Sequence, residues 1–230
     1  WAPDSRHLAY NQLRDLPKGT AETETYLDTT VFLLDCAQPD TPARPLFGPL
    51  VNKGLGLDRL DVAEVRFSPD SRWMIARTTD TTVPEGKLFV APVAALRSDT
   101  IAWRPVSTAP DKITDAKLRG DTLYLRSYAG APRGRVLALS LKDPVLARAK
   151  EVVTEPKVGV LTRFGLGSDA IYSEVRAGFN VRVHRHGAGR VDGGKDIAPA
   201  RPGSTFLIAD AANSYRDAWV DTSTWTDPPR

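Results

Sequence analysis

Short apolar runs bounded by turn residues recur along the whole chain. One set follows Pro-Asp-Ser-Arg, Gly-Asp or Ser-Asp turns: "HLAY" (7–10), "WMIA" (73–76), "TLYL" (122–125) and "AIYS" (170–173). A second set continues each unit: "TVFLLD" (30–35), "KLFVAPV" (87–93), "RVLALSL" (135–141) and "NVRVHRH" (180–186). The runs are short and rich in β-branched and aromatic residues, which is typical of strands. No long helical period occurs, and residues 144–153 have room for one or two helical turns at most.

The turns mark a structural repeat. "WAPDSRHLAYN" opens the chain and "FSPDSRWMIAR" returns at 67–77, and Asp4, Asp70, Asp121 and Asp169 follow one another at spacings of 66, 51 and 48 residues. A spacing of roughly 40–50 residues is typical of propeller blades. Further strands are expected before the last three turns (61–67, 113–118, 160–166) and at the ends of two units (101–106, 151–155).

These units predict an all-β fold, a partial β-propeller of about four to five four-stranded antiparallel blades, because radially stacked sheets cover one another's faces. We expect one domain over residues 1–230 with these approximate blades: 1–60, 61–110, 111–157, 158–203 and an incomplete 204–230. A β-sandwich is the alternative. Since Trp1 stands inside the repeated phrase and the first blade lacks its opening strand, we also expect a fragment of a longer chain.

Composition excludes several classes of protein. The net charge is +3 and the 31 basic and 28 acidic residues are interspersed, which does not favour nucleic-acid binding. No apolar run approaches the ~18 residues of a membrane helix. The compartment stays open between cytoplasm and periplasm. Cys36 is the single cysteine, so no intrachain disulfide forms, and we interpret it as a partly buried hydrophobe rather than a nucleophile.

Candidate catalytic residues are few. The chain contains no G-x-S-x-G nucleophile elbow, and Ser168 and Ser204 are interpreted as turn serines. His184 and His186 share a strand face and offer half a metal site, but without a visible acidic or cysteine partner we expect solvated edge positions. His7 is expected at a packing position. We therefore predict no catalytic, cofactor-binding or metal-binding residue and no cofactor.

The other polar and aromatic candidates have ordinary interpretations. The four repeated aspartates are expected to stabilise turns. Glu22 and Glu24 are expected in a solvated loop, although they could contact a partner domain. Arg133 and Arg135 are expected as surface charges at a strand entry, with a channel or partner contact as the alternative. Tryptophans 1, 73 and 103 are expected to pack between blades, and tryptophans 219 and 225 at a domain junction.

One long stretch carries a family resemblance. "DKITDAKLRGDTLYLRSYAGAPRGRVLALSLKDP" (111–144) resembles the propeller domain of prolyl oligopeptidase-family serine peptidases in its Gly-Asp turn before "LYLRS", its "APRGRV" strand entry and its "KDP". "WAPDSRHLAYNQ" followed by "GTAETETYLDTTVFLLD" is similar to a family blade with an extended loop. "YRDAWVDTSTWTDPP" (215–229) is similar to the family's last blade.

The resemblance implies a non-catalytic lid of a serine peptidase. The Ser-Asp-His triad would belong to a partner α/β-hydrolase domain of the parent protein, which these residues do not contain, and the propeller would restrict entry to short peptides, cleaved after proline. Whether this chain is part of an enzyme thus depends on the rest of the parent protein. Two alternatives stay open: a stand-alone propeller that binds a protein or peptide, and a propeller enzyme with its own central metal or acid pair.

Overall fold

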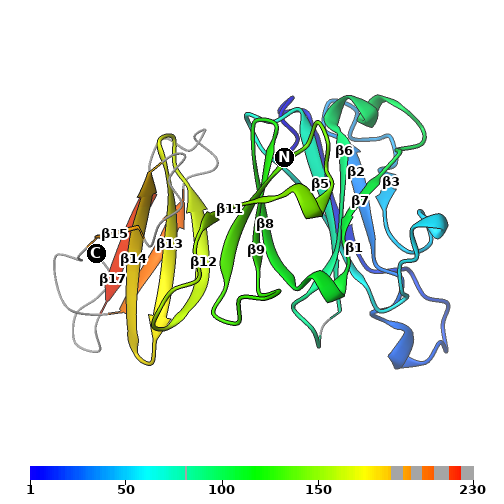
Figure 1. Ribbon diagram of the computed structural model, residues 1–230. Coiled ribbons are helices and arrows are strands. Elements are labelled where there is room, and N and C mark those ends of the chain that lie inside the picture. The colour runs from blue at the N-terminus through cyan, green and yellow to red at the C-terminus, as the bar shows by residue number, and fades with distance from the viewer. Residues whose placement is uncertain (81, 188–193, 198–203, 210–217, 224–230) are drawn as a thin grey trace. The chain divides into compact units, whose positions relative to one another are not determined.

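The computed structural model describes residues 1–80, 82–187, 194–197, 204–209 and 218–223. Within them the protein is an all-β partial propeller of antiparallel blades, which confirms the predicted fold class (Figure 1). The helical segments of these residues are short 3-10 turns: η1 (Glu22–Glu24), η2 (Lys53–Leu55), η3 (Val93–Arg97), η4 (Ala109–Asp111) and η5 (Leu146–Arg148). Across the same residues, no helix has the length and apolar character needed to span a membrane.

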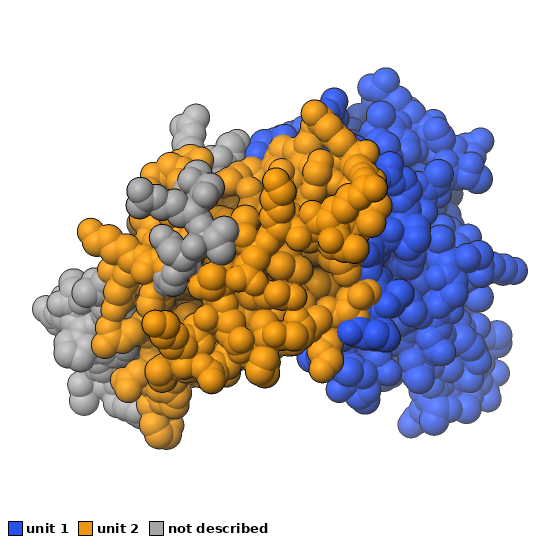
Figure 2. All heavy atoms as spheres, in the orientation of Figure 1, with its two compact units in different colours: residues 1–110 blue, residues 111–230 orange. Residues whose placement is uncertain are grey.

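Residues 1–110 form the first of two compact units, coloured blue in Figure 2. One sheet contains β1 (His7–Gln12), β2 (Thr30–Asp35) and β3 (Arg44–Phe47). The other contains β4 (Val62–Phe67), β5 (Trp73–Thr79), β6 (Gly86–Pro92) and β7 (Arg104–Ser107). Each strand pairs antiparallel with the next one in sequence, so both sheets are meanders.

Residues 111–230 form the second unit, drawn in orange where described. Its first sheet contains β8 (Ile113–Arg119), β9 (Thr122–Ser127), β10 (Arg135–Ser140) and β11 (Lys150–Val153). Its second contains β12 (Val160–Leu166), β13 (Ala170–Ala177), β14 (Asn180–Gly187) and β15 (Lys195–Ile197). A two-stranded sheet of β16 (Ser204–Ala209) and β17 (Ala218–Ser223) follows. That all 230 residues form one domain stays a prediction.

An aromatic cluster joins the two sheets of the first unit. Phe47 of β3 is fully buried, with its ring centroid 5.2 Å from Trp103 and 5.6 Å from Phe89. Alternating residues of β2 and β5, among them Val31 and Met74, complete this core. The cluster explains why neither sheet needs a second covering layer on this face: each buries its apolar side chains against the other.

The second unit has an equivalent core between its two four-stranded sheets. Val136 and Val153 of the β8–β11 sheet pack with Leu161 and Phe164 of the β12–β15 sheet. Gly134, with φ +83°, lies so close to β12 that an added Cβ would approach Leu161 to 3.3 Å. The close approach of the two sheets therefore depends on a glycine in the "APRGRV" segment.

Outer strands β3 and β7 share a sequence that the turn repeat did not indicate. β3 reads "RPLF" and β7 reads "RPVS", and each has its proline opposite a phenylalanine, Pro45 with Phe32 and Pro105 with Phe89. Both strands pair on one side only within their sheets. Proline lacks an N–H group and is tolerated in edge strands. The Pro/Gly-rich stretch before residue 56 thus contains a strand, β3, that sequence analysis missed.

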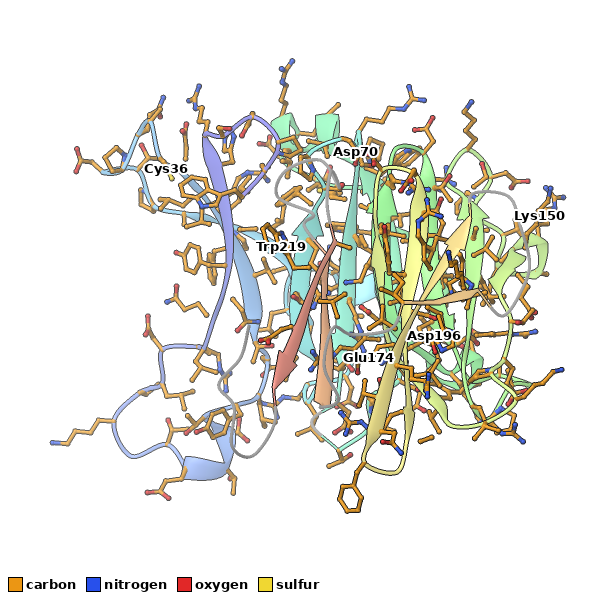
Figure 3. All side chains as sticks on the ribbon, turned by 90° about the vertical axis from the view of Figure 1, so that its left-hand side faces the viewer. Cys36, Asp70, Lys150, Glu174, Asp196 and Trp219 are labelled. Atoms are coloured by element: carbon orange, nitrogen blue, oxygen red, sulfur yellow. The ribbon has the colours of Figure 1, made fainter. Side chains whose placement is uncertain are left out.

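The predicted burial of Cys36 is wrong. Cys36 is exposed in the turn that follows β2 (Figure 3). Its N–H donates to the Arg6 carbonyl (3.0 Å), and Asp35 Oδ1 accepts the N–H of Ala37 (3.0 Å). This turn leads the chain away from the sheet immediately after Asp35, so the apolar pattern of β2 does not extend to the cysteine.

Candidate functional site

A pocket of about 340 Å³ lies between the two four-stranded sheets of the second unit. Its apolar wall is formed by Val153, Leu161 and Val175, and its rim by residues 154–158. His184 and His186 of β14 and Ser173 of β13 also line it. This volume is at the lower end of the range for small-molecule sites.

Ser173 and His186 form a buried hydrogen-bonded pair in this pocket. Ser173 Oγ and His186 Nε2 are 2.7 Å apart, and both residues are 1% exposed. Gly194 packs against the imidazole, where an added Cβ would approach ring atoms to 2.6 Å. The expectation of a solvated His186 is therefore wrong, because β14 is an interior strand and the imidazole is enclosed by contacts with Ser173 and Gly194. His184 is half-buried.

The Ser173–His186 pair lacks the context of a catalytic serine. A nucleophile elbow places its serine on a sharp strand-to-helix turn, whereas Ser173 lies in the middle of β13. The two nearby carboxylates have other partners: Glu174 Oε1 accepts the Thr162 hydroxyl (2.6 Å), and Glu155 Oε1 accepts the Arg133 N–H (2.8 Å). Ser168 is exposed in the turn before β13, and the side chain of Ser204 lies outside the described residues.

The described part of the chain contains no group of three or more His, Cys, Asp or Glu side chains placed to hold a metal ion. His184 and His186 share one face of β14, as their spacing predicts, and His186 uses Nε2 for its bond to Ser173.

Ser173→Ala is expected to destabilise the second unit by about 1–3 kcal/mol, because it leaves a buried imidazole nitrogen without its partner. The measurement is the free energy of unfolding in urea. Ser168→Ala, at an exposed turn, is the matched control and should change it by less than about 0.5 kcal/mol. Equal effects of the two variants would contradict the structural importance of the pair.

The repeated aspartates lie in turns, as predicted. Asp4 Oδ1 accepts the backbone N–H groups of Arg6 and His7 (both 3.0 Å), and Asp4 Oδ2 is 2.6 Å from His7 Nδ1. Asp70 accepts the Ser68 hydroxyl (2.7 Å), and Asp169 pairs with Arg185. Leu141 donates its N–H to the Asp121 carbonyl (2.9 Å). His7 is thus a partner of its own turn as well as a residue of β1.

Asp4 predicts a pH effect on stability. Burial raises the pKa of its carboxyl, but hydrogen bonds from Arg6 and His7 outweigh burial and lower the pKa to about 2. The ionised group therefore stabilises the fold above its ordinary pKa of about 4, and this stabilisation is lost as the pH falls from about 4 to 2. The side chain is partly exposed, so the effect stays below about 1 kcal/mol. Asp4→Asn should be less stable than wild type at pH 7 and equal to it near pH 2, by urea unfolding.

The control for this prediction is Asp40→Asn. Asp40 is exposed and forms no hydrogen bond with another described residue. The difference in free energy of unfolding between Asp40→Asn and wild type should stay constant across the same pH range. A difference for Asp4→Asn that persists at pH 2 would show that the charge is not the cause.

An ion-pair cluster holds the loop that carries Glu22 and Glu24. Arg59 donates to Asp28 Oδ2 (2.9 Å) and to Glu24 Oε2 (2.7 Å), and Arg14 donates to Glu24 Oε2 (3.2 Å). The hydrogen bond from Arg59 lowers the pKa of Glu24. The bonds that Arg59 donates to Asp28 and Glu24 raise the pKa of Arg59. Asp28 is buried with φ +57°. Glu22 is exposed as predicted, but Glu24 is a half-buried cluster member rather than a solvated loop residue.

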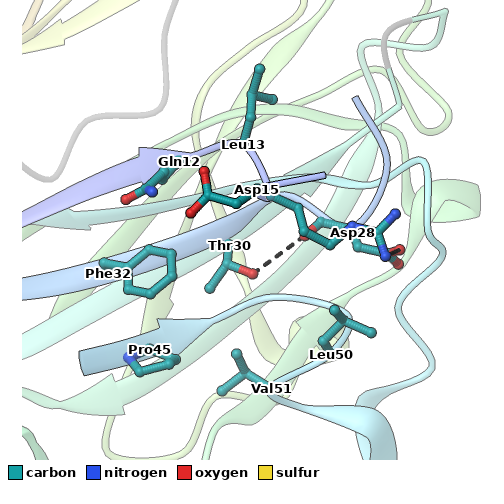
Figure 4. Close-up of a pocket in the computed structure, with 10 residues that line it drawn as sticks. Gln12, Leu13, Asp15, Asp28, Thr30, Phe32, Pro45, Leu50 and Val51 are labelled. Atoms are coloured by element: carbon teal, nitrogen blue, oxygen red, sulfur yellow. Dashed lines mark hydrogen bonds and ion pairs between the residues drawn. The ribbon is translucent and has the colours of Figure 1, made fainter. Parts of the chain in front are cut away.

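A second pocket, of about 460 Å³, lies beside this cluster in the first unit (Figure 4). Phe32, Pro45, Leu50 and Val51 supply an apolar surface, with Gln12 and Asp15 at its polar side. The surface belongs to the face of the β1–β3 sheet opposite the core residues Val31 and Leu33. It is therefore the uncovered apolar face of a blade.

The arginines of "APRGRV" bind backbone and carboxylate groups of neighbouring segments. Arg135 Nη1 donates to Glu151 Oε2 (3.1 Å) and Nη2 to the Ala129 carbonyl (3.0 Å). Arg133 Nη1 donates to the Pro156 carbonyl (3.1 Å) and to the Lys157 carbonyl. Arg133 is exposed as predicted, whereas Arg135 is half-buried.

The tryptophans divide into packed and exposed ones. Trp103 is 6% exposed in the aromatic cluster. The Arg104 guanidinium lies over the ring of Trp73, with its Cζ 5.8 Å from the ring centroid. Trp1 is 68% exposed, so its predicted packing between blades is wrong; it precedes β1 and pairs with no strand. Trp219 of β17 is 65% exposed, and Trp225 lies outside the described residues.

Comparison with known proteins identifies the fold of this chain through solved structures and not through a family model. No family model and no curated protein matches the chain. Among solved structures, a prolyl endopeptidase studied for inter-domain dynamics aligns over 100% of this chain and 32% of its own, with a TM-score of 0.78 and 17% identity. Prolyl oligopeptidase B from Galerina marginata aligns over 100% of this chain and 30% of its own (TM-score 0.77, 13% identity).

Oligopeptidase B from Leishmania major gives the same picture, with 100% of this chain and 31% of that one aligned, a TM-score of 0.71 and 14% identity. The chain spans about a third of the length of these solved structures. At such identities the likeness establishes the fold. The chain therefore has the β-propeller fold of the prolyl oligopeptidases, as its sequence resemblance predicts.

Proposed function

We propose that this chain is the non-catalytic propeller part of a prolyl oligopeptidase-type serine peptidase. The observation that carries the proposal is the alignment of the whole chain with about a third of prolyl endopeptidase and oligopeptidase B structures. The motifs at 111–144 and 215–229 support the same assignment independently of the coordinates. The absence of a G-x-S-x-G elbow from the sequence is consistent with a triad on another domain.

The proposed role is control of access. A propeller placed over a hydrolase site admits short peptides and excludes folded proteins, and closure removes bulk water from the reacting groups. The partner is an α/β-hydrolase domain of the same parent protein, and the reaction is hydrolysis of short peptides after proline. Galerina marginata prolyl oligopeptidase B, which has the same fold over this region, has been solved with a 35-residue hydrolysis and macrocyclization substrate.

The test uses the complete product of the gene that encodes this chain. It should hydrolyse a short proline-containing peptide efficiently and a folded protein with accessible prolines far more slowly, by mass spectrometry of the products. A chemically unfolded protein is the control for sequence preference. Equal rates on the peptide and the folded protein would refute access control. A gene product without a serine hydrolase elbow and without peptidase activity would favour the stand-alone binding propeller instead.

A further inference from the structure

The pocket between the β8–β11 and β12–β15 sheets has a preformed rim. Arg133 fixes this rim from three sides: its N–H donates to Glu155 Oε1 (2.8 Å), its guanidinium binds the carbonyls of Pro156 and Lys157, and its carbonyl accepts the N–H of Leu161 (2.8 Å). Tyr128 donates its hydroxyl to the Leu161 carbonyl (2.9 Å). A ligand would therefore meet ordered walls and lose little binding energy to loop ordering.

A glycine fixes the other end of the rim. Gly159 has φ +83°, and an added Cβ would lie 2.6 Å from the Arg176 carbonyl of β13. The segment from Glu155 to Gly159 is thus held by Arg133, in the loop before β10, on one side and by β13 on the other. Val158, 74% exposed, stands on this rim.

Two donor groups in the pocket are available to a ligand. Lys157 lines the pocket and is exposed, and its ammonium forms no ion pair with any other residue in the described ranges. The His184 ring is half-buried and likewise forms no hydrogen bond within these ranges. The acid at the rim, Glu155, already accepts the Arg133 N–H. The donors available in the pocket therefore favour a ligand with acceptor oxygens, and ammonium and imidazole groups are good donors to carboxylates.

The rest of the pocket wall is apolar. Val153, Leu161 and Val175 lie next to the two donors, and Ser173 and His186 at the wall are occupied with each other. An apolar side chain of the size of leucine would be stabilised there by burial of its surface. In about 340 Å³, the pocket combines room for one such side chain with two groups that can donate hydrogen bonds to a carboxylate.

We propose that this pocket binds the C-terminal residue of a short peptide, through an apolar side chain between the two sheets and a carboxylate at Lys157 and His184. The inference rests on the proposed function only in naming a peptide as the source of the ligand. The pocket itself lies wholly within the second unit and needs no hydrolase domain.

The experiment titrates the 230-residue chain with N-acetyl-L-leucine and with its neutral isostere N-acetyl-L-leucinamide, followed by NMR. We expect the acid to bind at least about tenfold more tightly than the amide, as for the loss of one charge-assisted hydrogen bond. The His184 ring resonances should shift with the acid. Lys157→Gln should lower the affinity for the acid, with His184 left as its one donor, and should leave the affinity for the amide unchanged. Lys142→Gln, at an exposed lysine outside the pocket, is the matched control.

The outcomes separate the possibilities. No binding of either compound, equal binding of acid and amide, or equal effects of Lys157→Gln and Lys142→Gln would overturn the site. Binding of 4-methylpentanoate as tight as that of N-acetyl-L-leucine would overturn the assignment to a peptide. None of these results bears on hydrolysis by the complete gene product, so the site and the proposed function fail separately.

Discussion

Replacement of Phe47 with alanine is expected to destabilise the first unit by about 3–5 kcal/mol, the range for removal of a buried phenylalanine. Phe47 is fully buried, and its ring contacts Trp103 edge-on and Phe89 at a tilt. The substitution would remove both aromatic contacts and leave a cavity between the two sheets. Urea unfolding followed by tryptophan fluorescence measures the loss, since Trp103 lies against the substituted side chain.

The matched control is the same substitution at Phe179. That side chain is 97% exposed in the turn between β13 and β14. Phe179→Ala should change the free energy of unfolding by less than about 0.5 kcal/mol. If Phe47→Ala proves as mild as Phe179→Ala, the two sheets of the first unit do not pack as described.

Replacement of Gly86 with alanine is expected to cost at least about 3 kcal/mol, at or above the upper end of the usual cost of overpacking. Gly86 begins β6 opposite Thr79 of β5. A Cβ there would lie 1.6 Å from the Thr78 carbonyl oxygen and 2.7 Å from its carbon. Both are backbone atoms in the β5–β6 pair, so the strands themselves must separate. Thermal unfolding by circular dichroism should show a lower midpoint or an unfolded chain.

Gly54→Ala supplies the control for this change. Gly54 lies in η2, and an added Cβ would meet no atom within 4 Å. Alanine there is expected to leave stability unchanged or to raise it by up to about 1 kcal/mol, because it restricts the unfolded chain. A Gly86→Ala protein as stable as Gly54→Ala would mean that β5 and β6 have more room than their register implies.

The strand pattern was largely predictable because each run carries its own boundaries. "TVFLLD" matches β2 residue for residue, since a short run of consecutive apolar residues stands between Thr30 and Asp35. Asp4 and Asp70 mark turns because aspartate binds backbone or hydroxyl donors a few residues away. These signals are local, and a single sequence therefore displays them.

The remaining features depend on contacts between distant residues. Ser173 and His186 come from different strands, and nothing near either residue indicates the other. The buried carboxylate of Asp28 is neutralised by Arg59, 31 residues later, and by Arg14. β3 was hidden because Pro45 argues against a strand, and only the sheet order shows that this strand lies at an edge. The "RP" pair shared by β3 and β7 is the local signal for this strand, and it lies outside the turns that define the repeat.

The prolines of β3 and β7 also bear on colloidal behaviour. An outermost strand with regularly spaced free amide groups can recruit a strand from another molecule and begin fibril growth. Pro45 and Pro105 each interrupt that row near the centre of a four-residue strand. In the β8–β11 sheet, Lys150 and Glu151 place charges on the corresponding outer strand, β11. The outer strands of these blades are thereby protected from intermolecular strand addition. Substitution of either proline by valine would be the change most prone to produce amyloid.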